Sequence, residues 1–191
     1  MRTILITILV LTLVAVGEYF LVRSQSPNLP QSYADRTLGF SIRYPAGYTP
    51  DAAYQYQEFG PGKEIGGVKF TIPATLAAGT NLGSDSYASV EALPKVASCS
   101  ATPFLDDPGA IRRMISENGR IYSFASSTGA AAGNRYEEIV YALPETNPCL
   151  ALRYFIHYGV LENYPPGAVR EFDESALLKQ FDAIRASLTL N

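Results

Sequence analysis

Apolar and polar residues alternate with a period of two over several short stretches of the chain, which is the pattern of β-strands with one buried face. In residues 37–45 this alternation places Phe40, Ile42 and Tyr44 on one face of a strand. Residues 98–106 favour a short helix instead. Further strand patterns occupy residues 53–59, 67–73, 86–93, 111–116, 120–126, 135–143 and 149–158.

Turn signals separate the last four of these patterns. Asn118-Gly119 is a strong signal for a two-residue hairpin turn. Residues 128–134 are small and predict a loop, and residues 144–148, with a proline at each end, predict the next turn. We therefore expect the last four strands to form an antiparallel meander.

Near the C-terminus the apolar period changes to that of a helix. Asp173 is placed to cap the N-terminus of this helix. One stripe of the helix would pack on the sheet through Leu177, Phe181, Ile184 and Leu188. The expected fold class is α+β, with an antiparallel β-sheet packed by a C-terminal helix.

The first 23 residues have the pattern of a membrane signal-anchor or a signal peptide. Arg2 precedes an apolar run over residues 4–16, and apolar residues resume at 19–22. The stretch from Thr3 to Val22 is about long enough to cross a hydrocarbon core of roughly 30 Å. The membrane is then the first expected partner, through this N-terminal helix.

Small residues at positions 15–17 also fit a signal-peptidase site, so cleavage is the alternative. Residues 24–32 contain two prolines and three serines and predict an extended linker. Residues 33–191 predict one extracytoplasmic α+β domain. This domain would be membrane-anchored if residues 1–23 remain, and periplasmic or secreted if they are removed.

Composition excludes several classes of function. The 191 residues include 15 Lys and Arg against 18 Asp and Glu, which leaves no basic surplus for binding nucleic acid. A single histidine and two cysteines exclude multi-histidine metal sites and zinc fingers, so no metal is expected. In an oxidising compartment we expect Cys99 and Cys149 to form a disulfide.

Several segments resemble known families. The segment Gly39-Phe40-Ser41-Ile42-Arg43-Tyr44-Pro45 resembles the first core strand of PsbP-like, Mog1-type α/β/α domains, and residues 178–188 resemble their C-terminal helix. The strings GAAAGNRYEE, CLALRYFIHY and NYPPG are similar to segments of uncharacterised bacterial envelope proteins with one N-terminal anchor. The resemblance implies a PsbP/Mog1-like sandwich that binds or scaffolds, and it carries over no catalytic residues.

A hairpin of residues 135–143 and 149–158 suggests a binding surface. If Leu143 lies near Cys149, Arg153 faces Ile139 and His157 faces Arg135. One face of the hairpin then carries Arg135, Glu137, Tyr141, Arg153 and His157. Its two arginines would suit an anionic ligand or a protein partner, and the alternative is a solvated lattice of ion pairs. A slip of one residue in the pairing would place these residues on opposite faces of the hairpin.

Two other candidates for function are Tyr164 and His157. Tyr164 lies in the loop Asn-Tyr-Pro-Pro-Gly, which two prolines stiffen, so ordering it on binding a partner would cost little entropy. His157 is the one histidine available to a catalytic triad, but no nucleophile-elbow or phosphate-loop motif accompanies it. We therefore predict no catalytic residues and no cofactor.

The predicted function is a non-enzymatic binding or accessory module of the cell envelope. Its partner would be an envelope protein or a small ligand. One alternative is an envelope hydrolase or sugar-active enzyme that uses His157 with a nearby carboxylate. The other is a carrier of a small apolar ligand, which needs a cavity between the sheet and the C-terminal helix.

Overall fold

The structure is a computed structural model that describes residues 27–105 and 107–191. The larger of its two antiparallel sheets contains β3 (Thr49–Asp51), β4 (Gln55–Tyr56), β5 (Ile65–Thr71), β6 (Tyr87–Leu93), β7 (Ile111–Glu117), β8 (Arg120–Ala131), β9 (Asn134–Ala142) and β10 (Cys149–Gly159). Their order is β3-β5-β6-β10-β9-β8-β7, and β4 pairs with β5. The smaller sheet contains β1 (Gln31–Asp35), β2 (Phe40–Tyr44) and β11 (Thr189–Leu190), in the order β1-β2-β11.

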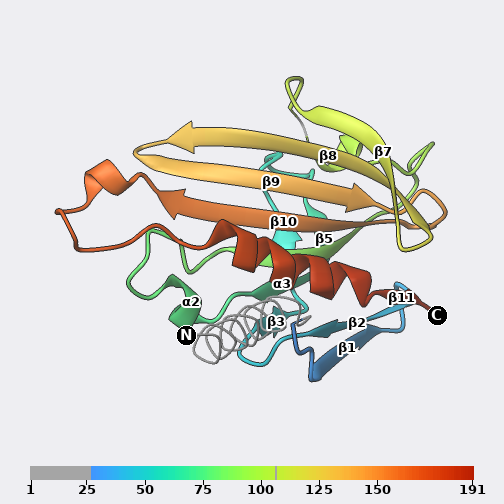
Figure 1. Ribbon diagram of the computed structural model, residues 1–191. Helices are drawn as coiled ribbons and strands as arrows, with labels where there is room; N and C mark the ends of the chain where they lie inside the picture. The colour runs from blue at the N-terminus through green and yellow to red at the C-terminus, as the bar shows by residue number, and fades with distance from the viewer. Residues whose placement is uncertain (1–26, 106) are drawn as a thin grey trace, which may run out of the picture.

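Helices are few in the described residues. They are α2 (Ala74–Ala77), α3 (Glu174–Ala186) and two 3-10 turns at Thr102–Phe104 and Leu161–Asn163. Figure 1 shows α3 lying along one face of the large sheet, with the small sheet beside it.

The meander predicted from residues 111–158 is confirmed, since β7, β8, β9 and β10 pair in chain order. Asn118 and Gly119, at φ 51° and 76°, form the predicted two-residue turn. The loop predicted at residues 128–134 is wrong. There β8 continues to Ala131, and a second two-residue turn follows at Ala132 and Gly133, at φ 49° and 80°.

The main core lies between the large sheet, α3 and the small sheet. Asp173 caps α3 as predicted, because its Oδ1 accepts a hydrogen bond from the N–H of Ala176 at 2.9 Å. The predicted apolar stripe of the helix is buried in this core, at Leu177, Phe181, Ile184 and Leu188. The sheets contribute, among others, Phe40, Ile42, Val68, Phe70, Leu152 and Tyr154.

A second core lies on the opposite face of the large sheet. Two covering segments, residues 51–65 and 99–105, contribute Tyr54, Tyr56, Ala101 and Phe104 to it. The predicted disulfide is confirmed: Cys99 of one covering segment is bonded to Cys149 at the start of β10. The bond therefore ties this cover to the central strand of the sheet.

The α+β prediction and the implied PsbP/Mog1-like sandwich are corrected by a β-rich fold, in which strands make up 45% of the described residues. A sandwich of the α/β/α type has helices over both faces of its sheet. Here the second face is covered by coil, by β4 and by the turn Thr102–Phe104. Of the helix expected over 98–106, this turn is the part that forms among the described residues 98–105. The α3 helix is the one helix longer than a single turn in the described part of the chain.

The predictions for the N-terminal 32 residues fall mostly outside the part of the chain that the structure describes. Residues 1–23, expected to be a signal or an anchor, lie outside the described part of the chain. The first strand, β1, begins at Gln31, inside the stretch expected to be a linker. Among the described residues, no helix combines the length and the apolar character that a membrane span requires.

Candidate functional site

The predicted polar face is not one surface, because β9 and β10 pair one residue away from the expected register. Arg153 lies opposite Val140 and not opposite Ile139. Since neighbours along a strand point to opposite faces, this step moves Arg135 and Glu137 to the face that carries α3. Arg153 points to the other face, so the predicted residues are divided between the two sides of the sheet.

The turn between the two strands sets this register. The N–H of Leu143 donates to the carbonyl of Leu150 at 2.9 Å. The hydroxyl of Thr146 donates to the Leu143 carbonyl and accepts from the Leu150 N–H, both at 2.8 Å. These bonds hold Leu143 opposite Leu150, whereas the prediction placed it near Cys149. A hydroxyl within a turn leaves no periodic signal in the sequence.

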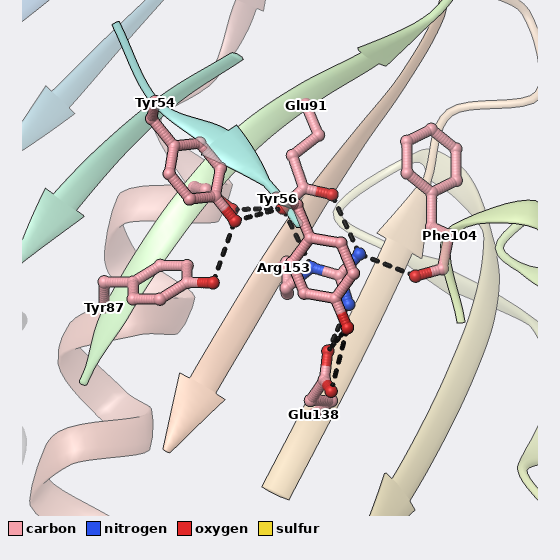
Figure 2. A network of polar contacts seen from close by, with 8 residues as sticks. Tyr54, Tyr56, Tyr87, Glu91, Phe104, Glu138 and Arg153 are labelled. Atoms are coloured by element: carbon pink, nitrogen blue, oxygen red, sulfur yellow. Dashed lines mark hydrogen bonds and ion pairs between the residues drawn. The ribbon is translucent and has the colours of Figure 1, made fainter. Parts of the chain in front are cut away.

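Arg153 is the centre of a polar network on the second face (Figure 2). Its guanidinium donates from Nε and Nη2 to the two carboxylate oxygens of Glu91, at 2.8 and 2.9 Å. Nη2 also donates to the carbonyl of Phe104 at 2.6 Å, and Nη1 forms an ion pair with Glu138. The ring of Tyr56 covers the guanidinium, with its centroid 3.6 Å from Cζ. The two-point pairing with Glu91 is the strongest geometry between arginine and a carboxylate.

Tyrosine hydroxyls complete the network. Tyr54 donates to Glu91 at 3.0 Å, and its oxygen lies 2.8 Å from the hydroxyl of Tyr87. Tyr56 donates to the two oxygens of Glu138 at 3.1 and 3.0 Å. Burial, and then the charge of Glu91, raises the pKa of Tyr54 far above its ordinary value. The hydroxyls therefore stay protonated and serve as donors to the carboxylates.

The network is closed to ligands. The side chains of Arg153 and Glu91 are each 0% exposed. Burial alone would lower the pKa of Arg153, but Glu91 and Glu138 outweigh it and raise that pKa above its ordinary value. Arg153 therefore remains charged, and it joins the covering segments to the sheet. The prediction that Arg153 binds a ligand is thus corrected, because the side chain is enclosed in this network.

His157 is paired with an acid, but its ring meets no nucleophile among the described residues. Its Nδ1 lies 2.8 Å from Oδ1 of Asp85, and its ring stacks on Tyr136 with centroids 4.7 Å apart. The hydroxyl of Ser86 bonds to the backbone N–H and carbonyl of His157 and not to its ring. Nε2 is buried without a hydrogen-bond partner in the described part of the chain. A triad would need a nucleophile at this nitrogen.

Arg135 and Glu137 remain close together on the α3 face. They line a shallow hollow of about 340 Å³ with Tyr158 and Thr128. The hydroxyl of Tyr158 donates to Glu137 at 2.7 Å, and burial followed by this bond raises the pKa of Tyr158 to about 12. Arg135 is exposed here, so contact of an anionic group with this arginine stays a prediction.

Tyr164 points inward and not away from its loop. A Cβ added to Gly159 would lie 2.2 Å from the Tyr164 hydroxyl oxygen, so the ring lies directly against the backbone of β10. The side chain is half-buried. The Tyr164 side chain therefore offers a partner less exposed surface than its loop sequence predicts.

Several residues of the network are not predicted from the sequence. Glu91 carries a signal that could have been used, because a carboxylate within the apolar strand Tyr87–Leu93 needs a buried partner. Tyr54 and Tyr56 lie in the covering segment 51–65, where the strand β4 spans only Gln55–Tyr56, and they carry no comparable signal. Asp85 lies in a turn, and only the tertiary fold brings it to His157.

The space beneath α3, which a ligand carrier would need, is filled by side chains. They include Phe40, Phe70, Tyr154, Phe181 and Ile184, each at most 1% exposed. An open hollow of about 530 Å³ lies elsewhere, between the covering segments, and its apolar lining includes Phe59, Ile65, Leu93 and Val96. Within the described residues, no three His, Cys, Asp or Glu side chains cluster closely enough to hold a metal ion.

Comparison with known proteins gives little further information. No family model matches the chain, and no curated protein matches it. One solved structure, from Bacteroides thetaiotaomicron, is similar at a TM-score of 0.47 and 11% sequence identity. The match covers 87% of this chain and 49% of the other, so the chain spans about half the length of that protein.

Proposed function

We propose that the protein is a non-enzymatic binding or accessory module of the cell envelope, exported from the cytoplasm and tethered by its apolar N-terminal segment. The observation that carries this proposal is the disulfide between Cys99 and Cys149. Structural disulfides persist in oxidising compartments and are rare in the cytosol. Cys149 is 1% exposed, so the bond belongs to the second core and has the character of a structural link.

The surroundings of His157 favour binding over catalysis. The Asp85 pair is the one feature that supports the alternative, a hydrolase or a sugar-active enzyme. Against it, the ring stacks on Tyr136 and its Nε2, the nitrogen not paired with Asp85, is buried away from a substrate proton. Arg135, exposed beside the hollow on the α3 face, is the contact point that we assign to an anionic partner.

The test is membrane fractionation and intact mass of the full-length protein, with thiol alkylation before and after reduction. We expect a membrane-bound species that retains residues 1–23 and takes up alkylating reagent only after reduction. A Cys99→Ser variant is the matched control, because its remaining thiol reacts without reductant once the protein is unfolded. Two alkylatable thiols in the native, unreduced protein would contradict export, and a soluble species without residues 1–23 would contradict the tether.

A further inference from the structure

Exposed hydrophobic residues gather on the β7–β8 hairpin. Of the five large hydrophobic side chains that are exposed in the described residues, three lie here: Ile111 at 62%, Met114 at 59% and Ile121 at 55%. β7 is the last strand of the large sheet, and no described strand pairs with its outer edge. Its seven residues include neither proline, which would block pairing, nor glycine, which would weaken the strand. Such an edge is a template for another strand.

The turn after β7 determines which backbone groups face outward. In a two-residue turn the flanking residues, here Glu117 and Arg120, form a hydrogen-bonded pair. Hydrogen-bonded and non-hydrogen-bonded positions then alternate along the strand. The residues that direct their N–H and carbonyl groups away from β8 are therefore Arg112, Met114 and Ser116.

We propose that β7 pairs antiparallel with β7 of a second copy of this chain, around a twofold axis at Ile115. In this register the two Ile115 residues face each other, Arg113 faces the second copy's Glu117, and Met114 faces its Ser116. Outward-facing backbone groups then meet outward-facing groups, as an antiparallel ladder requires. The two large sheets become one continuous sheet across the axis.

Charge selects this register. The twofold axis makes the Arg113–Glu117 pair twice, and opposite charges directly across an antiparallel ladder stabilise it. Oε2 of Glu117 is held by Arg185 at 2.7 Å, and the Glu117 side chain is 43% exposed, so this side chain is accessible to a second arginine. Arg113 lies over the ring of Phe124, with Cζ 4.6 Å from the centroid, so its side chain is already held on this face.

The neighbouring register is less favourable. An axis at Met114 would place the charged Glu117 opposite Ile111 and Arg113 opposite Ile115, and neither charge would gain a partner. With the axis at Ile115, Met114 instead lies over the small Ser116. Within each copy, Ser116 is paired with Ile121 of β8. Met114 of one copy can therefore extend across the second copy's Ser116 toward that copy's exposed Ile121.

Cysteine cross-linking of the full-length protein in detergent tests the pairing. Facing Ile115 residues form a non-hydrogen-bonded pair, with Cα atoms about 4.5 Å apart, which lies within the range of a disulfide. Because Cys99 and Cys149 are already bonded, Ile115→Cys introduces a single free thiol into the described residues. We expect mild oxidation to convert most of this variant into a dimer that reductant separates.

Two matched variants fix the register. Ile111→Cys places an exposed thiol on the same face of the same strand, but far from the axis, and should give no dimer. Met114→Cys should cross-link poorly, because the two thiols would be diagonal neighbours. Efficient cross-linking at Met114 in place of Ile115 would overturn the proposed register.

Sedimentation of the wild-type chain tests the pairing without any change at Ile115. We expect a mass near twice 20.7 kDa after correction for detergent. Arg113→Glu should shift the protein toward the monomer at the same concentration, whereas Arg36→Glu, an exposed arginine outside β7, should not. A wild-type monomer without cross-linking at Ile115 would overturn the proposal. Because this readout is independent of disulfide formation and of membrane binding, its failure leaves the proposed function intact.

Discussion

Replacing Arg153 by methionine tests whether the closed network holds the covering segments on the sheet. Methionine keeps an unbranched side chain but removes the charge and the four polar contacts that the guanidinium makes. Glu91, which is 0% exposed, would retain only the hydroxyls of Tyr54 and Ser89 among its described partners. Removing one partner of a buried ion pair costs about 3–5 kcal/mol, against roughly 5–15 kcal/mol for the stability of a whole domain.

The assay is urea-induced unfolding at pH 7, followed by circular dichroism and by tyrosine fluorescence, since the chain has no tryptophan. We expect Arg153→Met to lower the free energy of unfolding by about 3–5 kcal/mol. The same substitution at the exposed Arg36 should change it by less than about 0.5 kcal/mol. Arg153→Met with Glu91→Gln should be more stable than Arg153→Met alone, because the fully buried Glu91 carboxylate no longer stands without a cation. A loss below about 1 kcal/mol for the single variant, or a less stable double variant, would refute this reasoning.

Three further predictions concern the stability of the domain. Gly67→Ala should prevent folding or strongly lower the melting temperature, because a Cβ there would lie 2.1 Å from the Val90 carbonyl oxygen, whereas Gly66→Ala has open space and should be tolerated. Cys99→Ser opens a loop with a sequence separation of 50 and should cost about 4 kcal/mol in a urea titration. The helix-capping hydrogen bond from the backbone, and then a serine hydroxyl, lower the pKa of Asp173, so its contribution is lost as pH falls through that lowered value. Asp173→Ala should therefore lower the melting temperature at pH 7, and its difference from wild type should shrink below about pH 4.

Local signals in the sequence predicted much of the meander and the helix. Asn118 and Gly119 readily adopt the positive φ angles that a two-residue hairpin turn needs, and the turn forms there. Asp173 has a capping side chain placed just before an apolar stripe, and it caps α3. Each of these features depends on residues close together in the chain, which is why the sequence alone is sufficient to predict them.

The candidate site depends on contacts that no local pattern contains. A hydroxyl bond from Thr146 sets the β9–β10 register, and one residue of displacement separates Arg153 from Arg135. The closing of the network depends on Tyr54 and Tyr56, which come from a covering segment that only the folded chain brings over the sheet. The predicted fold class is wrong for a related reason. The strand pattern shows that a face of the sheet is buried, but a coil cover and a helical cover bury the same apolar face.

The small sheet has a consequence for the order of folding. Its strands β2 and β11 join distant parts of the chain: the hydroxyls of Ser41 and Thr189 lie 2.7 Å apart across a sequence separation of 148. Contacts at such separation are slow to form, because the entropy of closing a long loop is lost before the contacts contribute any favourable energy. Strands β7 to β10, in contrast, pair with their neighbours in the chain. A chain that emerges N-terminus first therefore leaves the apolar face of Phe40 and Ile42 uncovered until α3 and β11 have followed. The meander is free to form earlier, so we expect the main core to be the last part of the domain to close.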